Sequence, residues 1–170
     1  MQESGGQDSL EEQVVWLLKK QDFTITAAES CTGGMIAGTL VNVAGASDVF
    51  GEAYVTYSNE AKHRLVGVNE ETLKQFGAVS EETAYEMAAG AARAAGADVG
   101  LSSTGIAGPG GGTLEKPVGL VYIGCFVCGK VQVRRLNLHG SREQIRRNTV
   151  EAVLKLAAEM LMECEKSSVK

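Results

Sequence analysis

Apolar residues along this chain recur at two spacings, and segments of the two kinds alternate through most of its length. Helical spacing, together with residues that start and end helices, predicts helices at 10–20, 33–43, 60–65, 70–76, 81–95 and 142–163. Short runs rich in β-prone residues predict strands at 23–28, 50–57, 98–103, 118–127 and 130–138. A short turn at Cys128-Gly129 joins the last two strands, so they should form an antiparallel hairpin in a mixed α/β sheet.

The composition fits one globular domain and disfavours two classes of partner. The 170 residues are 44% hydrophobic, which is enough material for a real core. A formal net charge of −5 argues against nucleic acid, which attracts basic surfaces. No apolar run approaches the roughly 20 residues that span a bilayer, and the N-terminus lacks the apolar core of a signal peptide. We therefore expect no membrane association and a cytoplasmic protein, with a disordered tail over residues 1–9.

The four cysteines are expected to be reduced thiols, because disulfides are rare in cytoplasmic proteins. Cys125 and Cys128 form a C-x-x-C motif, but they lie in and just after a predicted strand. Since the chain has only two histidines, a zinc site is a weak hypothesis. We predict neither a metal nor a cofactor.

The turn between the first strand and the next helix holds the first candidate for chemistry. Ser30 stands at the carboxyl end of the strand, where open α/β sheets bind ligands. Gly33 and Gly34 follow in the predicted first turn of the helix, where each costs roughly 1 kcal/mol relative to alanine. Such glycines suit a ligand that approaches the backbone, and a helix N-terminus offers free N–H groups. The alternative is that Ser30 or Thr32 only caps the helix, and the local pattern alone favours that alternative.

Lys62 is the second candidate. Asn59 is a good N-cap, which puts Lys62 at the third helical position, where a capping box has Glu or Gln. The helix dipole disfavours a cation there and should lower the pKa of the Lys62 ammonium, more so if the side chain is buried. The alternative is a solvated surface lysine in an imperfectly capped helix.

The loop at 104–117 is rich in glycine and lies between two predicted strands. It is no P-loop, because no Gly-Lys-Ser/Thr closes it and no helix follows it. We expect a shaped loop over the edge of the sheet.

The last helix should begin with a capping box at Ser141 and Gln144. Its apolar stripe extends back through Arg146 and Arg142 towards the helix start. The two arginines either cover the edge of the core with their stems or bind an anion, since guanidinium matches phosphate and carboxylate geometry.

Several motifs in order resemble one known family. They are Ala28-Glu29-Ser30-Cys31-Thr32-Gly33-Gly34, Tyr57-Ser58-Asn59-Glu60-Ala61-Lys62, Gly77-Ala78-Val79-Ser80-Glu81, Thr104-Gly105-Ile106-Ala107-Gly108-Pro109 and Lys116-Pro117-Val118-Gly119. Together they resemble the CinA C-terminal domain family over about residues 8 to 163, and stand-alone members include nicotinamide-nucleotide amidases. The resemblance implies hydrolysis of the carboxamide of nicotinamide mononucleotide to nicotinate mononucleotide and ammonia, in pyridine-nucleotide recycling.

The resemblance also implies residue roles. The matching catalytic positions are Ser30 as nucleophile, Lys62 as its base and Tyr57, whose hydroxyl would relay a proton or hold the lysine. The matching substrate-binding positions are Thr32, Gly33, Gly34, Thr104, Gly105 and Arg146. Backbone N–H groups at 32–34 would stabilise the oxyanion, and the other three residues would seat the nucleotide.

Three alternatives stay open. Arg142 and Arg147 compete with Arg146 for the phosphate, and Cys31 could replace Ser30 as nucleophile. A non-catalytic, competence-associated module could bind a nucleotide in the same pocket, although a binder needs no base beside a serine. The expected architecture is a single-domain three-layer α/β/α sandwich with a mixed β-sheet over residues 10–165. The resemblance suggests a homo-oligomer.

Overall fold

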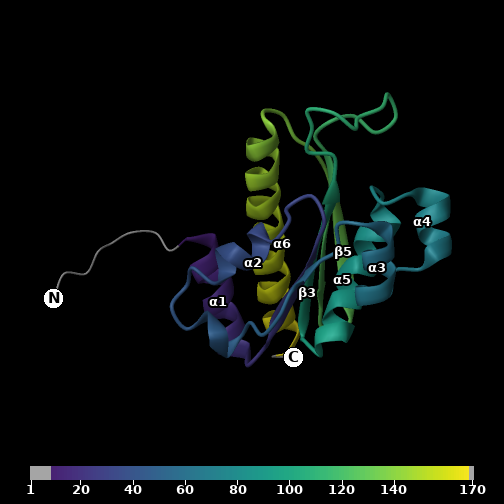
Figure 1. Ribbon diagram of the computed structural model, residues 1–170. Coiled ribbons are helices and arrows are strands. Elements are labelled where there is room, and N and C mark those ends of the chain that lie inside the picture. The colour runs from purple at the N-terminus through teal and green to yellow at the C-terminus, as the bar shows by residue number, and fades with distance from the viewer. Residues whose placement is uncertain (1–8, 169–170) are drawn as a thin grey trace.

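A five-stranded sheet with the order β2-β1-β3-β4-β5 runs through the middle of the molecule (Figure 1). The computed structural model describes residues 9–168. The strands are β1 (Ile25–Glu29), β2 (Tyr54–Val55), β3 (Val99–Gly105), β4 (Leu120–Val127) and β5 (Lys130–Asn137). β1 is parallel to β2 and β3, whereas β4 is antiparallel to both β3 and β5. The predicted mixed sheet is confirmed.

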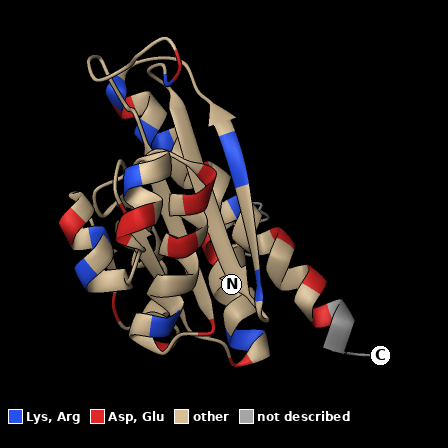
Figure 2. Ribbon diagram, turned by 90° about the vertical axis from the view of Figure 1, so that its right-hand side faces the viewer, with Lys and Arg blue, Asp and Glu red and all other residues tan. Residues whose placement is uncertain are grey.

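Helices cover both faces of this sheet, so the predicted three-layer α/β/α sandwich is confirmed too (Figure 1). On one face lie α1 (Leu10–Gln21), α2 (Met35–Leu40) and α6 (Arg142–Ser168). On the other lie α3 (Asn59–Val66), α4 (Glu70–Phe76) and α5 (Glu81–Ala95). Figure 2 shows charged residues on the helices and on the outer strand β5, while β3 and β4 hold none. β1 holds a single one, Glu29.

The helix ends follow from local sequence. Ser9 and Glu12 form a capping box at α1, so Ser9 is ordered; the rest of the predicted disordered tail lies outside the described residues. Ser141 and Gln144 form the predicted reciprocal pair ahead of α6. α5 begins after Ser80 and ends at Gly96, as predicted.

Three predicted elements differ from the structure. The strand predicted at 50–57 is reduced to two residues of β2, with Phe50 in an isolated bridge to Ile25. Between them the Thr26 hydroxyl donates to the Glu52 carbonyl at 2.7 Å, so a side chain replaces a ladder bond there. The helix predicted from Gly33 begins only at Met35, and α6 extends beyond the predicted residue 163 to Ser168.

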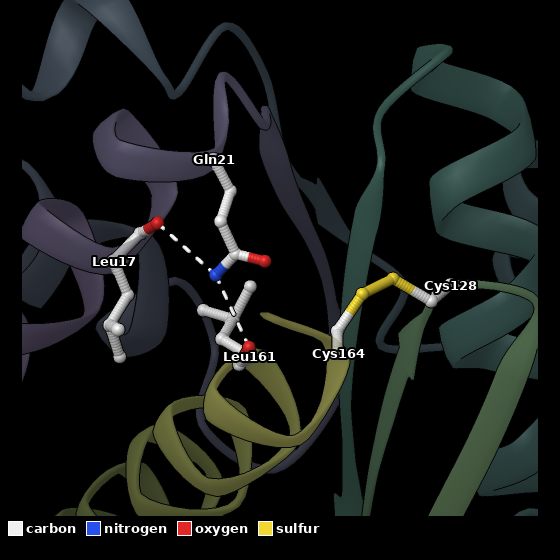
Figure 3. The surroundings of a disulfide bond; sticks show 5 residues. All are labelled: Leu17, Gln21, Cys128, Leu161 and Cys164. Carbon is white, nitrogen blue, oxygen red and sulfur yellow. Dashed lines mark hydrogen bonds between the residues drawn. A yellow bond between two sulfur atoms is a disulfide. The ribbon is translucent and has the colours of Figure 1, made fainter. Parts of the chain in front are cut away.

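The expectation of four reduced thiols is wrong for one pair. A disulfide joins Cys128, in the turn between β4 and β5, to Cys164 on α6, with 6.4 Å between their Cα atoms (Figure 3). The Cys128 and Gly129 φ angles of 52° and 73° make this the tight turn that brings Cys128 back over α6. The other two, Cys31 and Cys125, are free and buried, and burial raises the pKa of the Cys125 thiol to about 12.

Close backbone contact positions α3, the helix that carries Lys62. A Cβ added at Gly90 of α5 would lie 1.8 Å from the Val66 carbonyl oxygen, near the end of α3. Only a glycine lets the two helices approach this closely. The alanine-rich surface of α5 thus fixes α3 against the sheet.

We therefore expect Gly90→Ala to lower the free energy of unfolding by about 1–3 kcal/mol, because the clash with backbone outweighs the better helix propensity of alanine. Denaturant unfolding measures the change. Gly38→Ala is the matched control, since a Cβ at that helical glycine of α2 meets nothing within 4 Å. It should leave stability unchanged or raise it, and an equal effect of the two substitutions would contradict the packing argument.

Candidate active site

Ser30 opens onto a pocket at the carboxyl ends of β1 and β3. Its backbone N–H donates to the Ser103 carbonyl at 2.9 Å, which ties the residue to the end of β3. The pocket has a volume of about 230 Å³ and is lined by Ser30, Cys31, Tyr57, Lys62, Ala78, Val79, Thr104, Gly105, Ala107 and Arg142. Five of the nine residues predicted for the site are therefore in its wall: Ser30, Tyr57, Lys62, Thr104 and Gly105.

Lys62 is buried, with only 1% of its surface exposed, and its Nζ lies 3.1 Å from Ser30 Oγ. The same Nζ lies 2.8 Å from the Thr56 carbonyl oxygen and 3.5 Å from that of Tyr57. Ser58, not Asn59, caps α3, so Lys62 is the fourth helical residue rather than the third. The predicted alternative of a solvated surface lysine is wrong.

The environment of Lys62 makes its ammonium group easier to deprotonate. Burial lowers the pKa of the Lys62 ammonium to about 8, because desolvation penalises the charged form. A neutral amine has two N–H donors and one lone pair. The two carbonyl oxygens can take the two donors, which leaves the lone pair for the hydroxyl hydrogen of Ser30.

The turn after Ser30 does not offer the N–H groups that the sequence suggested. Gly33 and Gly34 have φ angles of 57° and 101°, so they precede α2 in the left-handed region instead of opening it. The Gly33 N–H donates to the Ser30 carbonyl, and the Gly34 N–H donates to the carboxylate of Glu29. Their proposed role as oxyanion donors therefore needs correcting.

Two other N–H groups in this turn stay available. Among the described residues, no oxygen accepts from the N–H of Cys31 or of Thr32. Of these two residues, Cys31 lines the pocket, whereas Thr32 is fully buried and lies outside the pocket wall. Its hydroxyl is buried between Glu29 and Ser103, at 2.6 Å from each.

The arginines of α6 divide their contacts differently from the prediction. Arg146 donates to the carbonyls of Cys31 and Thr32, both at 3.0 Å, and is absent from the pocket wall. Arg142 lines the pocket and donates to the Gly108 carbonyl at 2.8 Å. Arg147 is largely exposed and pairs with Glu143. Of the three candidates, Arg142 is the one placed to meet a ligand.

Tyr57 reaches the site with both its backbone and its ring. Its carbonyl contacts Lys62, but its side chain is exposed, and its hydroxyl accepts from Arg142 at 3.3 Å. This geometry does not support a proton relay through the Tyr57 hydroxyl to Lys62. The ring stands instead at the mouth of the pocket beside Arg142.

Ala78 and Val79, for which the sequence predicted no role, also line the pocket. The Thr104 hydroxyl donates to the Ala78 carbonyl at 2.6 Å, and Lys116 Nζ donates to the Val79 carbonyl at 2.8 Å. These bonds hold the segment before α5 and the glycine-rich loop against the end of β3. The sequence did mark these segments, because the motifs at 77–81 and 116–119 contributed to the family resemblance. It assigned no role to their residues.

Within the described residues, no three His, Cys, Asp or Glu side chains gather in a way that could hold a metal ion. None of the described helices is long and apolar enough to cross a membrane.

The model of the CinA C-terminal domain matches residues 7–161. The chain belongs to the CinA C-terminal domain family. A CinA-like protein of Kosmotoga olearia is 62% identical over 141 residues, which are 83% of this chain and 34% of that protein. A putative competence-damage inducible protein of Clostridium acetobutylicum is 54% identical over 149 residues, 88% of this chain and 36% of that protein. The chain spans about a third of the length of these curated relatives.

Solved CinA structures share the fold over nearly their whole length. The competence/damage inducible protein CihA of Agrobacterium tumefaciens is 41% identical, with a TM-score of 0.84 over 90% of this chain and 96% of that one. A CinA superfamily protein of Klebsiella pneumoniae is 33% identical, with a TM-score of 0.87 over 91% and 96%. The sandwich described above is therefore the CinA C-terminal fold.

The environment of Lys62 can be measured without any substrate. In protein labelled with ¹³C at lysine Cε, one signal should titrate with a midpoint near pH 8, because burial favours loss of the proton. Below that midpoint Lys62 carries its charge, and above it the amine is neutral. The signal should be missing from Lys62→Arg. The absence of such a signal in the unmodified protein, or its persistence in Lys62→Arg, would contradict the assignment.

Proposed function

We propose that this chain is a nicotinamide-nucleotide amidase, which hydrolyses the carboxamide of nicotinamide mononucleotide to nicotinate mononucleotide and ammonia. The observation that supports the proposal most is the 3.1 Å contact between the buried Lys62 amine and the Ser30 hydroxyl at the floor of a pocket. A serine hydroxyl is a weak nucleophile until a base takes its proton, and a lysine of lowered pKa can be that base.

In the first half of the reaction, Ser30 Oγ attacks the carboxamide carbon while its proton passes to Lys62 Nζ. The carbonyl oxygen becomes an oxyanion, which the N–H group of Cys31 would stabilise. Lys62 then gives the proton to the amide nitrogen, the C–N bond breaks, and ammonia leaves an ester on Ser30. In the second half, water attacks that ester with Lys62 as base, which releases the carboxylate product and restores the Ser30 hydroxyl.

The size of the pocket suggests how a nucleotide would lie. At about 230 Å³ it is smaller than the ~300–1,000 Å³ of sites that enclose a whole ligand. The nicotinamide ring would therefore enter it, while the ribose phosphate would stay at the mouth. Arg142 and the exposed ring of Tyr57 stand at that mouth and would bind the phosphate and flank the sugar.

Cys31 is a poor competitor for the nucleophile. Burial raises the pKa of the Cys31 thiol to about 11, so little thiolate exists near neutral pH. The hydrogen bond of the Lys62 amine goes to the Ser30 hydroxyl, not to the Cys31 thiol.

The proposal is tested by ammonia release from nicotinamide mononucleotide. Ser30→Ala and Lys62→Arg should each lower kcat by at least about 1,000-fold, since a positioned nucleophile and base are lost and an arginine cannot accept the proton. Both variants should still bind substrate in calorimetry. Cys31→Ala is the control and should keep most of the activity. Substrate binding without ammonia release by the unmodified chain would favour the non-catalytic nucleotide-binding module instead.

Arg142→Ala should raise KM for the nucleotide by about 10- to 100-fold, the range expected from losing a charged hydrogen bond. It should change the slower hydrolysis of the dephosphorylated riboside much less, because only the phosphate contact is removed. Arg146→Ala should impair both substrates equally, because Arg146 holds backbone carbonyls. Arg147→Ala is the matched control and should be silent. If Arg146→Ala lost activity on the nucleotide but not on the riboside, Arg146 rather than Arg142 would be the residue that binds the phosphate.

A further inference from the structure

Glu29 is a buried carboxylate that the proposed reaction does not use. It is 0% exposed and is the only charged residue in the three central strands β1, β3 and β4. Placing such a group in the interior is costly unless hydrogen bonds replace its hydration. Glu29 directly precedes Ser30 in the chain, so a structural role beside Ser30 would account for this cost.

Four donors from the following turn and the start of α2 satisfy the Glu29 carboxylate. The N–H groups of Gly34 and Ile36 donate to it at 3.0 Å and that of Ala37 at 2.9 Å. The Thr32 hydroxyl donates to the same group at 2.6 Å. Because both carboxylate oxygens are occupied by these donors, Glu29 is not arranged to take a proton from a substrate.

These contacts replace a helix cap that the turn lacks. Gly34 is the N-cap of α2 and has no side chain, so the first N–H groups of the helix would otherwise be orphaned. The carboxylate fills this positive end of the helix from within the protein. The turn can then bend through two left-handed glycines and still be fixed in one conformation.

Arg146 holds the same turn from its carbonyl side. It donates to the Cys31 and Thr32 carbonyls, whereas Glu29 accepts from the N–H groups that follow. In a trans peptide the C=O and N–H bonds point in opposite directions. With the Cys31 carbonyl bound to Arg146, the orientation of the peptide between Cys31 and Thr32 is therefore fixed, and with it the turn that follows Ser30.

We propose that Glu29 is a positioning residue for the reaction. Its carboxylate fixes the turn at residues 30–34 so that Ser30 faces Lys62 while the N–H group of Cys31 remains free to bind the oxyanion. This inference rests on the proposed amidase function for its kinetic test, but a second measurement separates the two.

The kinetic test is Glu29→Gln, which keeps the shape of the side chain but turns one accepting oxygen into a donor. We expect kcat to fall by about 100-fold, as when one oxyanion donor is lost, with KM changed less than about threefold. Glu12→Gln is the matched control, because Glu12 also caps a helix but lies far from the site at α1. It should keep the full kcat. A Glu29→Gln protein that is folded by circular dichroism and keeps its kcat would overturn the proposal.

A milder pair of variants covers the case in which Glu29→Gln does not fold. Thr32→Val removes the hydroxyl between Glu29 and Ser103 and keeps the shape, whereas Thr32→Ser keeps the hydroxyl. We expect Thr32→Val to lower kcat by about 10-fold and Thr32→Ser, which keeps the hydroxyl, to lower it clearly less. Equal kcat in these two variants would count against a positioning network.

The second measurement is the rate at which a sulfonyl fluoride modifies Ser30, followed by mass spectrometry, which needs no carboxamide. The unmodified protein should be labelled at Ser30, and Glu29→Gln about 10-fold more slowly. If the unmodified protein is labelled but releases no ammonia, the substrate assignment fails while the role of Glu29 is still tested. Equal labelling rates in the two proteins would overturn the role of Glu29.

Discussion

The site depends on the burial of one lysine amine, that of Lys62, away from solvent. Lys62 loses its hydration on folding and recovers only three oxygens, one of which belongs to Ser30. Desolvation destabilises the charged amine more than the neutral one, so the pKa of Lys62 falls. The neutral form, which has a lone pair beside the Ser30 hydroxyl, becomes easier to reach. Several features of the fold serve this burial. The close approach of α5 to α3 at Gly90 fixes the helix, and the carbonyls after β2 receive the amine.

Much of the fold followed from local sequence because its signals are local. The caps at Ser80 and Ser141, the glycine at the end of α5 and the tight turn after β4 each act within a few residues. β2 did not follow, because its shortening depends on a Thr26 side chain from the neighbouring strand. The disulfide was missed because cysteines of a cytoplasmic protein are expected to be reduced, whereas this bond joins two chain segments that meet only in the folded protein.

For the site, the sequence identified the right segments better than the right contacts. Motifs placed Ser30 and Lys62 together, and the structure brings their side chains to hydrogen-bonding distance. Arg142 and Arg146 lie one turn apart on the same stripe, so spacing alone could not tell which one meets a ligand and which one meets backbone. Glu29 was overlooked because nothing in a strand of five buried residues reveals that its donors come from the next turn.

The Glu29 carboxylate caps the N-terminus of α2 from inside the protein. This has a consequence for how the ligands of such a site can change. Many α/β proteins use a helix N-terminus to bind the ligand's phosphate, which couples recognition to the backbone next to the chemistry. Here that terminus is closed by Glu29, so phosphate recognition would fall to side chains on another helix. Mutation could exchange those side chains one at a time without disturbing the turn that holds Ser30. If the proposed amidase function holds, a site built in this way could change the ligand it prefers over evolution while the turn at residues 30–34 stays the same.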